Sequence, residues 1–416
     1  MENQRTYPKG YEAKMVIILC FVFGFVMMDR QAISLLSVFL VDDLGLTTAQ
    51  FGFVMSGFAI TWAISGYLGG FLSDKFYNHK RLVLGLSVLL FSIFSFTTGL
   101  AKGYMSLLII RVIMGLFEGP ALPTSQSIMV AQSTPSRRGA NMGIMQGTAP
   151  SLFAIVIAPI VLVALAGAFN WRVTFFFTII PGLILVFFIF KTLKEPYPDK
   201  KPPELEKAEK VSPVVVFKNR NSLLSFIMSP FYIGWYILIV SFTPLFLVTV
   251  KGFTPTQMSF IVAALGAGGV FWGVVVPAIS DRWGRKRTFI LFCFISMVAP
   301  LAMIYVPSSQ VFLLCFLLFL GFCGVGCHPL YMSTIPSESV GLKYAGTAVG
   351  TIMAFGEIGG GFVGVAIAGI LGGKYGLGAV MWLAAGFALV TWLLSFGYYE
   401  TAPNVLAKRA AKQEVA

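Results

Sequence analysis

Long runs of apolar residues, separated by short polar stretches, dominate this 416-residue chain. A helix needs about 20 apolar residues to cross the hydrocarbon core of a bilayer, and twelve runs reach or approach that length. They predict spans at 15–40, 50–73, 82–100, 105–131, 140–165, 172–191, 222–249, 256–280, 288–306, 311–335, 344–371 and 377–399. We therefore predict an all-α membrane protein with twelve transmembrane helices.

Composition agrees with this interpretation and excludes a soluble domain. Hydrophobic residues make up 57% of the chain and charged residues 11%, whereas soluble domains carry about 25% charged residues. The mean hydropathy is +0.84. The net charge of +13 comes mainly from Lys and Arg in one alternate set of loops, which the positive-inside rule places in the cytoplasm together with both termini. We therefore expect no nucleic-acid partner.

A short charged pattern occurs twice, after the second and after the eighth predicted span. The first copy contains Asp74, Lys75 and Arg81, and the second contains Asp281, Arg282 and Arg285. The two aspartates are separated by almost half of the chain, which predicts two six-span halves of the same topology. We predict an N-terminal bundle over 1–190, a cytoplasmic linker over 191–220, a C-terminal bundle over 221–400 and a cytoplasmic tail over 401–416.

These loops, together with Arg111-x-x-x-Gly115 in the fourth span, resemble the signature of the major facilitator superfamily over essentially the whole chain. The first copy departs from that signature around Asn78, and the second has Pro277 in place of the leading Gly. The resemblance implies two pseudo-symmetric six-helix bundles that work by alternating access. It also implies that the charged loop residues are conformational gates, whose Asp accepts hydrogen bonds from a helix N-terminus and basic groups.

Four charged residues lie near the middle of two predicted spans. Asp29 and Arg30 are adjacent in the first span, and Arg111 and Glu118 lie one heptad apart in the fourth. A charge at this depth costs about 2.5–3.5 kcal/mol, so such residues indicate either a function or a buried structural ion pair. Adjacent helix residues point about 100° apart, so Asp29 and Arg30 cannot face one partner. We predict that Asp29 pairs with Arg111, which leaves Arg30 and Glu118 for ligand and proton.

The same residues resemble one branch of the superfamily, the anion:cation symporters, which include bacterial sugar-acid transporters, sialin and the vesicular glutamate transporters. The match rests on Asp29-Arg30 and on R-x-x-x-G-x-x-E-G-x-x-x-P in the fourth span, and it is weaker in the C-terminal half. It implies that Arg30 binds the substrate carboxylate and that Asp29 and Glu118 couple protons. The basic residue that vesicular members carry in the seventh span has no counterpart in 222–249.

Further polar or aromatic residues within the spans are candidate substrate contacts: Trp62, Gln146, Tyr232, Tyr236, Thr334 and Glu357. Structural alternatives remain open, with Gln146 as an interhelical hydrogen bond and the two tyrosines as members of an interfacial belt. The symporter branch more often has an amide near Glu357. A Glu there adds a proton site, or an acceptor for a substrate hydroxyl or amine. When ionised it repels an anion unless Arg30 or a proton offsets it.

The sequence therefore predicts a proton-coupled secondary transporter that imports a small organic anion, such as a sugar acid or an aromatic acid. The alternative is proton-driven export of drugs or amphipathic cations, which the aromatic spans favour and Arg30 opposes. We expect no enzyme activity, metal site or disulfide, and no cofactor beyond the coupling proton, because nucleophile and metal-ligand arrangements are not evident. Short outer loops favour a bacterial inner membrane, where we expect a monomer surrounded by lipid.

Overall fold

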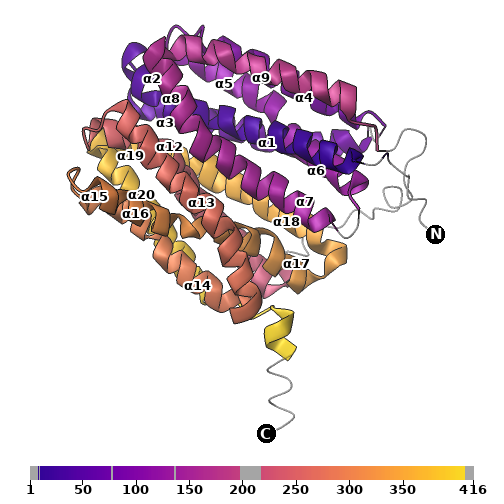
Figure 1. Ribbon diagram of the computed structural model, residues 1–416. Helices are drawn as coiled ribbons and strands as arrows, with labels where there is room; N and C mark the ends of the chain where they lie inside the picture. Colours follow the sequence, from indigo (N-terminus) through magenta and orange to yellow (C-terminus); the bar gives the residue numbers. More distant parts are fainter. Residues whose placement is uncertain (1–7, 9, 76–77, 135–136, 197–216, 408–416) are drawn as a thin grey trace.

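The computed structural model describes residue 8 and residues 10–75, 78–134, 137–196 and 217–407 (Figure 1). Within these ranges, the side chains of 67, 70–75, 138–140, 147 and 342–346 are not described. The described residues form helices joined by short connections, with no strand among them. Over the described ranges, eleven helices are long and apolar enough to cross a membrane, and a twelfth span is counted when Ser37–Asp43 and Thr48–Gly66, bent by 119°, are taken together. The predicted all-α fold is confirmed.

The first six spans form one bundle. Its helices are α1 (Tyr11–Leu35), α2 (Ser37–Asp43), α3 (Thr48–Lys75), α4 (Lys80–Thr98), α5 (Tyr104–Glu118), α6 (Ala121–Gln132), α7 (Arg138–Gly143), η1 (Ile144–Thr148), η2 (Ser151–Ile157), α8 (Ala158–Ala168) and α9 (Trp171–Thr192). Of the predicted linker 191–220, residues 197–216 lie outside the described part of the chain.

The last six spans form the second bundle. Its helices are α12 (Arg220–Thr249), α13 (Pro255–Trp283), α14 (Arg285–Ser296), α15 (Val298–Tyr305), α16 (Val311–Gly321), η3 (Phe322–Cys327), η4 (Leu330–Thr334), α17 (Ile335–Val340), α18 (Leu342–Gly356), η5 (Glu357–Gly364), α19 (Val365–Tyr375) and α20 (Leu377–Ser395). The predicted tail lies within the described residues only as far as 407.

Several spans are interrupted near their midpoints. The fourth changes from α5 to α6 at Gly119 and Pro120, because proline has no amide hydrogen to continue the helical ladder. The tenth passes through the 3₁₀ turns of η3 and the π turns of η4. The eleventh contains π-helical η5, whose first residue is Glu357. Wide π turns occur frequently at functional sites, and here one of them begins at a charged residue.

The two bundles lie side by side, with the N-terminal half in indigo to magenta and the C-terminal half in orange to yellow (Figure 1). We call the end of the molecule where α1 begins and α20 ends the terminal end, and the opposite end the distal end. Gly52 of α3 lies so close to Gly369 of α19 that a Cβ on Gly52 would come within 2.7 Å of the Gly369 Cα. Ser34 of α1 donates a hydrogen bond of 2.5 Å to the carbonyl of Ser241 in α12. Both contacts join the halves near the distal end.

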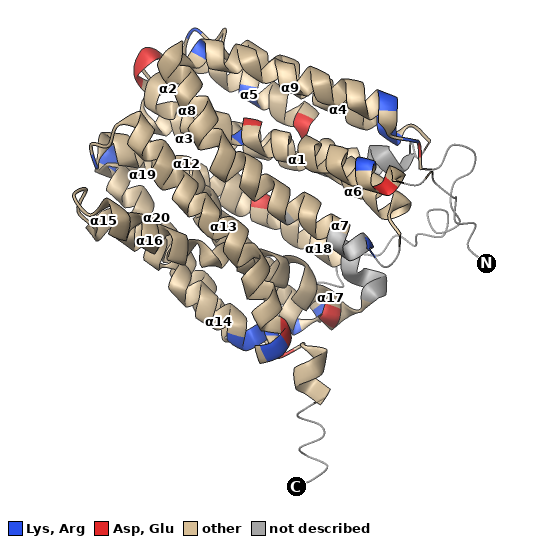
Figure 2. Ribbon diagram, viewed as in Figure 1, with Lys and Arg blue, Asp and Glu red and all other residues tan. Residues whose placement is uncertain are grey.

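Charged residues gather at the ends of the helices, and only a few lie inside the bundles (Figure 2). Among the described residues, those fully or nearly buried in the middle are Asp29, Arg111, Glu118 and Glu357. Arg30 lies beside them with 15% of its side chain exposed. We call these five residues the central cluster.

Candidate functional site

Asp29 of α1 is fully buried and faces the interior of the N-terminal half. Ser95 of α4 donates a hydrogen bond to its Oδ1, and Ser95 also contacts the Thr178 hydroxyl of α9 at 2.8 Å. Its Oδ2 has no hydrogen-bond partner among the residues that the structure describes. Arg111 is close enough to interact electrostatically, but no direct ion pair joins it to Asp29 among the described residues. The expected Asp29–Arg111 unit thus acts through a longer-range attraction here.

Arg111 of α5 is also fully buried, and its guanidinium lies over the Phe58 ring at 4.5 Å from the centroid. Its Nη2 donates a long hydrogen bond of 3.5 Å to the backbone carbonyl of Arg30. Within the described ranges, its Nε has no hydrogen-bond partner. Cations bind the faces of aromatic rings, so Phe58 partly replaces the water that Arg111 has lost. Arg111 therefore supports the backbone of α1 beside the two central charges.

Glu118 is the last residue of α5 and is fully buried. Neither of its carboxylate oxygens has a hydrogen-bond partner in the described part of the chain. The charged groups that act on it are Arg30, Asp29 and Arg111. A buried carboxylate without donors is costly when ionised, and the C-terminal end of a helix adds further negative potential. Burial therefore opposes ionisation of Glu118, whereas the nearby cations Arg30 and Arg111 and the indole of Trp62 favour the ionised carboxylate.

Arg30 points away from Asp29 and reaches the C-terminal half. Its Nη2 donates to Oε2 of Glu357 at 3.4 Å, and these side chains are 15% and 10% exposed. The guanidinium also lies over the Trp62 ring at 4.8 Å and over the Phe58 ring at 5.5 Å. The adjacent residues of α1 thus turn toward different halves of the protein, as their helical positions require.

The remaining predicted substrate contacts lie at different places. Tyr236 is half-buried and within electrostatic range of Arg30 and Glu357. Tyr232 is buried in the C-terminal half, where its hydroxyl donates to the Gly324 carbonyl at 2.6 Å. Gln146 is exposed and accepts a 2.9 Å hydrogen bond from Gln126. Thr334 is half-buried at the end of η4. The structure thus brings Trp62 and Tyr236 to the central cluster but not Tyr232 or Gln146.

The predicted gate residues lie at the terminal end. The side chains of Asp74 and Lys75 are outside the described part of the structure. Arg81 is held by Glu195, which accepts hydrogen bonds of 3.1 and 3.2 Å from its backbone amide. Glu195 thereby caps the N-terminus of α4.

In the other half, Arg285 forms ion pairs with Asp281 at 2.5 Å and with Glu338 at 3.0 Å, whereas Arg282 is exposed. Glu400 accepts hydrogen bonds from the backbone amides of Arg285 at 2.7 Å and Lys286 at 3.3 Å. It thus caps α14 as Glu195 caps α4.

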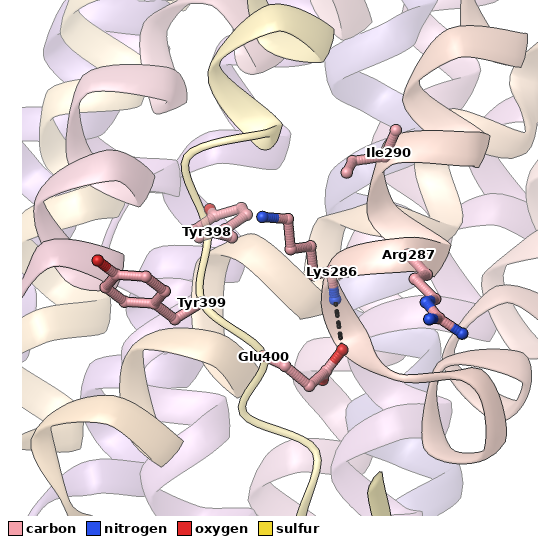
Figure 3. Close-up of a pocket in the computed structure, with 6 residues that line it drawn as sticks. All are labelled: Lys286, Arg287, Ile290, Tyr398, Tyr399 and Glu400. Atoms are coloured by element: carbon pink, nitrogen blue, oxygen red, sulfur yellow. Dashed lines mark hydrogen bonds between the residues drawn. The ribbon is translucent and has the colours of Figure 1, made fainter. Parts of the chain in front are cut away.

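A cavity of about 300 Å³ at this position is lined by Lys286, Arg287, Ile290, Tyr398, Tyr399 and Glu400 (Figure 3). It lies at the terminal end of the C-terminal half and contains no residue of the central cluster. Its Glu400 is engaged in capping α14, so we assign the cavity to the helix cap and not to the substrate. The buried charged groups expected in the binding site of a transporter lie instead in the central cluster.

Sequence reasoning did not single out Ser95, Glu195, Glu338 or Glu400. Ser95 carried no signal, because serine is frequent in apolar spans and only the packing of α4 on α1 brings it to Asp29. Glu195 and Glu400 each follow the last helix of a half and cap the third helix of that half. An alignment of the two halves could have revealed this pair.

Two six-helix bundles with charged residues buried between them define a membrane transporter of pseudo-symmetric design. The family model of the Major Facilitator Superfamily matches residues 19–363. The chain belongs to this superfamily, which consists of transporters and not of enzymes.

Curated relatives include a hexuronate transporter of Bacillus subtilis, 32% identical over 282 residues, which cover 66% of this chain and 65% of that protein. The chain thus spans about two thirds of that relative's length. A probable sulfoacetate transporter of Cupriavidus necator is 27% identical over 362 residues, covering 80% of this chain and 81% of that protein. A solved structure of a D-xylose–proton symporter superposes with a TM-score of 0.74 at 17% identity, covering 94% of this chain and 98% of that one, and it shows the same fold.

Proposed function

We propose that the protein imports a small organic anion together with protons, and that the anion is a carboxylate such as a sugar acid or an aromatic acid. The relatives named for hexuronate and sulfoacetate support an acidic substrate. Arg30 supports it chemically, because its guanidinium is only slightly exposed at the meeting point of the two halves and presents paired N–H donors suited to a carboxylate.

The observation that carries the proton coupling is the environment of Glu118. In the described part of the chain, both oxygens of Glu118 and the Oδ2 of Asp29 are buried without a hydrogen-bond partner. Binding a proton removes the cost of a buried charge, and losing it restores attraction to Arg30 and Arg111. Asp29 and Glu118 therefore serve as the proton carriers, with Arg111 as the fixed charge between them.

The contacts between the two halves support a mechanism of alternating access. In the described ranges, every hydrogen bond that joins the two halves involves Arg30 or Ser34, and the Ser34 bonds lie near the distal end. The positive-inside rule supports a cytoplasmic location for the terminal end, and we propose that the membrane is a bacterial inner membrane. We therefore interpret this state as closed toward the outside, and the charged loops around Arg81 and Arg285 as the gates that close in the opposite state.

Transport into proteoliposomes tests the proposal. Radiolabelled D-glucuronate, sulfoacetate and 3-phenylpropionate are offered under an imposed pH gradient, acidic outside. We expect at least one of them to accumulate above equilibrium and the accumulation to collapse when the gradient is dissipated by a protonophore. Efflux of a cationic dye driven by the opposite gradient, with no carboxylate uptake, would refute anion import and favour drug export.

A further inference from the structure

The ion pair between Arg30 and Glu357 crosses the boundary between the two halves. Arg30 belongs to α1, and Glu357 begins η5 in the eleventh span. In the described ranges it is the one ion pair that connects the N-terminal half to the C-terminal half. Its two side chains are 15% and 10% exposed, so water screens the attraction only slightly. The pair thus ties together two bodies that must move relative to each other during transport.

Arg30 is held in place by its own half. Its guanidinium lies over the rings of Trp62 and Phe58, both on α3, at 4.8 and 5.5 Å. Its backbone carbonyl accepts the hydrogen bond from Arg111. All of these contacts lie within the N-terminal half, so they hold the guanidinium without a contribution from Glu357. A second anion could therefore use the same donor.

Glu357 is held less firmly. The 3.4 Å bond to Arg30 is the hydrogen bond that the structure shows for its carboxylate. Strong charge-assisted bonds are about 2.7–2.9 Å long, so this one is loose. The Oε2 atom lies over Gly361 one turn further along η5, where a Cβ would come within 2.9 Å of it. A glycine there leaves the carboxylate room to approach Arg30 and room to withdraw.

We propose that Glu357 occupies, in the empty carrier, the position on Arg30 that the carboxylate of the substrate takes when it binds. This inference rests on the proposed function, in which Arg30 binds an anion. Trp62 and Phe58 lie over the Arg30 guanidinium, and water screens this site only slightly. A substrate carboxylate and an ionised Glu357 would therefore repel each other as they compete for the open edge of Arg30. We therefore expect one to replace the other. Substrate binding then breaks the ion pair that ties the halves together at the central cluster.

The exchange defines the class of ligand. The ligand must present an anionic head as compact as a carboxylate, because the Arg30 donor is enclosed by the faces of Trp62 and Phe58. The free energy of ligand binding then includes the gain from the bond between the ligand and Arg30, minus the loss of the bond between Glu357 and Arg30. Glu357 therefore weakens the binding of every anionic ligand that must displace it, and its removal should strengthen the binding of all of them.

Equilibrium binding tests this directly with the purified full-length chain in detergent, measured by calorimetry. D-glucuronate, sulfoacetate and 3-phenylpropionate are titrated into the wild type, and the tightest binder is carried forward. We expect Glu357→Gln to bind it about tenfold more tightly, a difference equivalent to about 1.4 kcal/mol. Glu357→Asp, whose shorter side chain withdraws from Arg30, should show a smaller gain in the same direction. The control is Asp42→Asn, which removes one exposed carboxylate at the distal end and should leave the dissociation constant unchanged.

The outcomes separate this inference from the proposed function. Loss of binding in Arg30→Ala with tighter binding in Glu357→Gln supports both. Loss in Arg30→Ala with unchanged or weaker binding in Glu357→Gln and Glu357→Asp overturns the exchange and leaves Arg30 as the anion site. Retained affinity in Arg30→Ala, or no binding of any of the three anions to the wild type, overturns both. If Glu357→Gln fails to fold, the Glu357→Asp result decides.

Discussion

At the scale of single residues, Glu118 stands out because both of its oxygens are buried without a hydrogen-bond donor in the part of the chain that the structure describes. Glu118→Gln keeps the size and polarity of the side chain but cannot exchange a proton. We expect this variant to lose accumulation driven by a pH gradient while it still exchanges labelled for unlabelled anion across the membrane. Counterflow and gradient-driven uptake, measured in the same proteoliposomes, check the two activities. Wild-type accumulation by Glu118→Gln would remove Glu118 from the coupling step, and Asp42→Asn serves as the control for loss of a carboxylate.

The guanidinium of Arg30, the proposed anion-binding group, lies 4.8 Å from the ring centroid of Trp62. A cation over an aromatic face contributes about 0.5–2 kcal/mol, depending on how well water is excluded. We expect Trp62→Leu to weaken anion binding about threefold to thirtyfold, and Trp62→Phe to weaken it less. Dissociation constants from calorimetry provide the measurement. An equal loss in both variants would contradict a role for the ring face and would favour simple packing.

At the scale of elements, the contact of α3 with α19 closes the distal end. A side chain on Gly52 would collide with the backbone at Gly369, so Gly52→Leu should prevent this closure and favour the opposite state. We expect the distance between spin labels at the distal ends of the two halves to increase and uptake to fall. Gly378→Ala, where a Cβ meets no atom within 4 Å, is the matched control. An unchanged distance distribution in Gly52→Leu would show that this contact does not control closure.

Glu400 caps the N-terminus of α14 and thereby contributes to the stability of the C-terminal half. Its carboxylate accepts hydrogen bonds from the amides of Arg285 and Lys286. Loss of an N-terminal cap costs about 0.5–2 kcal/mol, so Glu400→Ala should lower the midpoint of thermal unfolding by a few degrees. Glu400→Gln keeps an acceptor and should lose less. Unfolding is followed by intrinsic fluorescence of the purified protein. A midpoint for Glu400→Ala equal to that of the wild type would contradict the capping role.

The elements also show what sequence can and cannot predict. Span number and order followed from the length of the apolar runs, because the bilayer imposes one length on every helix. The π turns of η5 and the 3₁₀ turns of η3 were not predicted, since they depend on shifts of single backbone hydrogen bonds that side-chain patterns do not encode. Asp29, Arg30 and Glu118 were identified because a charged side chain inside a membrane has a high free-energy cost. The direct ion pair between Arg30 and Glu357 could not be predicted from the sequence, because it depends on how two distant spans meet.

At the scale of the whole molecule, the charges of the central cluster constrain how transport responds to voltage. The cluster contains one acidic residue more than it has basic ones: Asp29, Glu118 and Glu357 against Arg30 and Arg111. Buried net charge is costly, so the empty carrier reaches neutrality with one bound proton and the carrier loaded with a monovalent anion with two. For the proposed proton-coupled import, we therefore expect each turnover to move one anion with one proton and no net charge to cross the membrane.

We therefore expect uptake of a monovalent anion such as D-glucuronate to respond to a pH gradient and not to a membrane potential alone. Proteoliposomes loaded with potassium and treated with valinomycin isolate the potential, and an imposed pH step isolates the proton gradient. Accumulation driven by the potential at equal pH would show that more than one proton accompanies each anion. In that case the carrier must cross the membrane with a net charge in one of its two states, either empty with all three acidic residues of the cluster ionised or loaded with all three protonated.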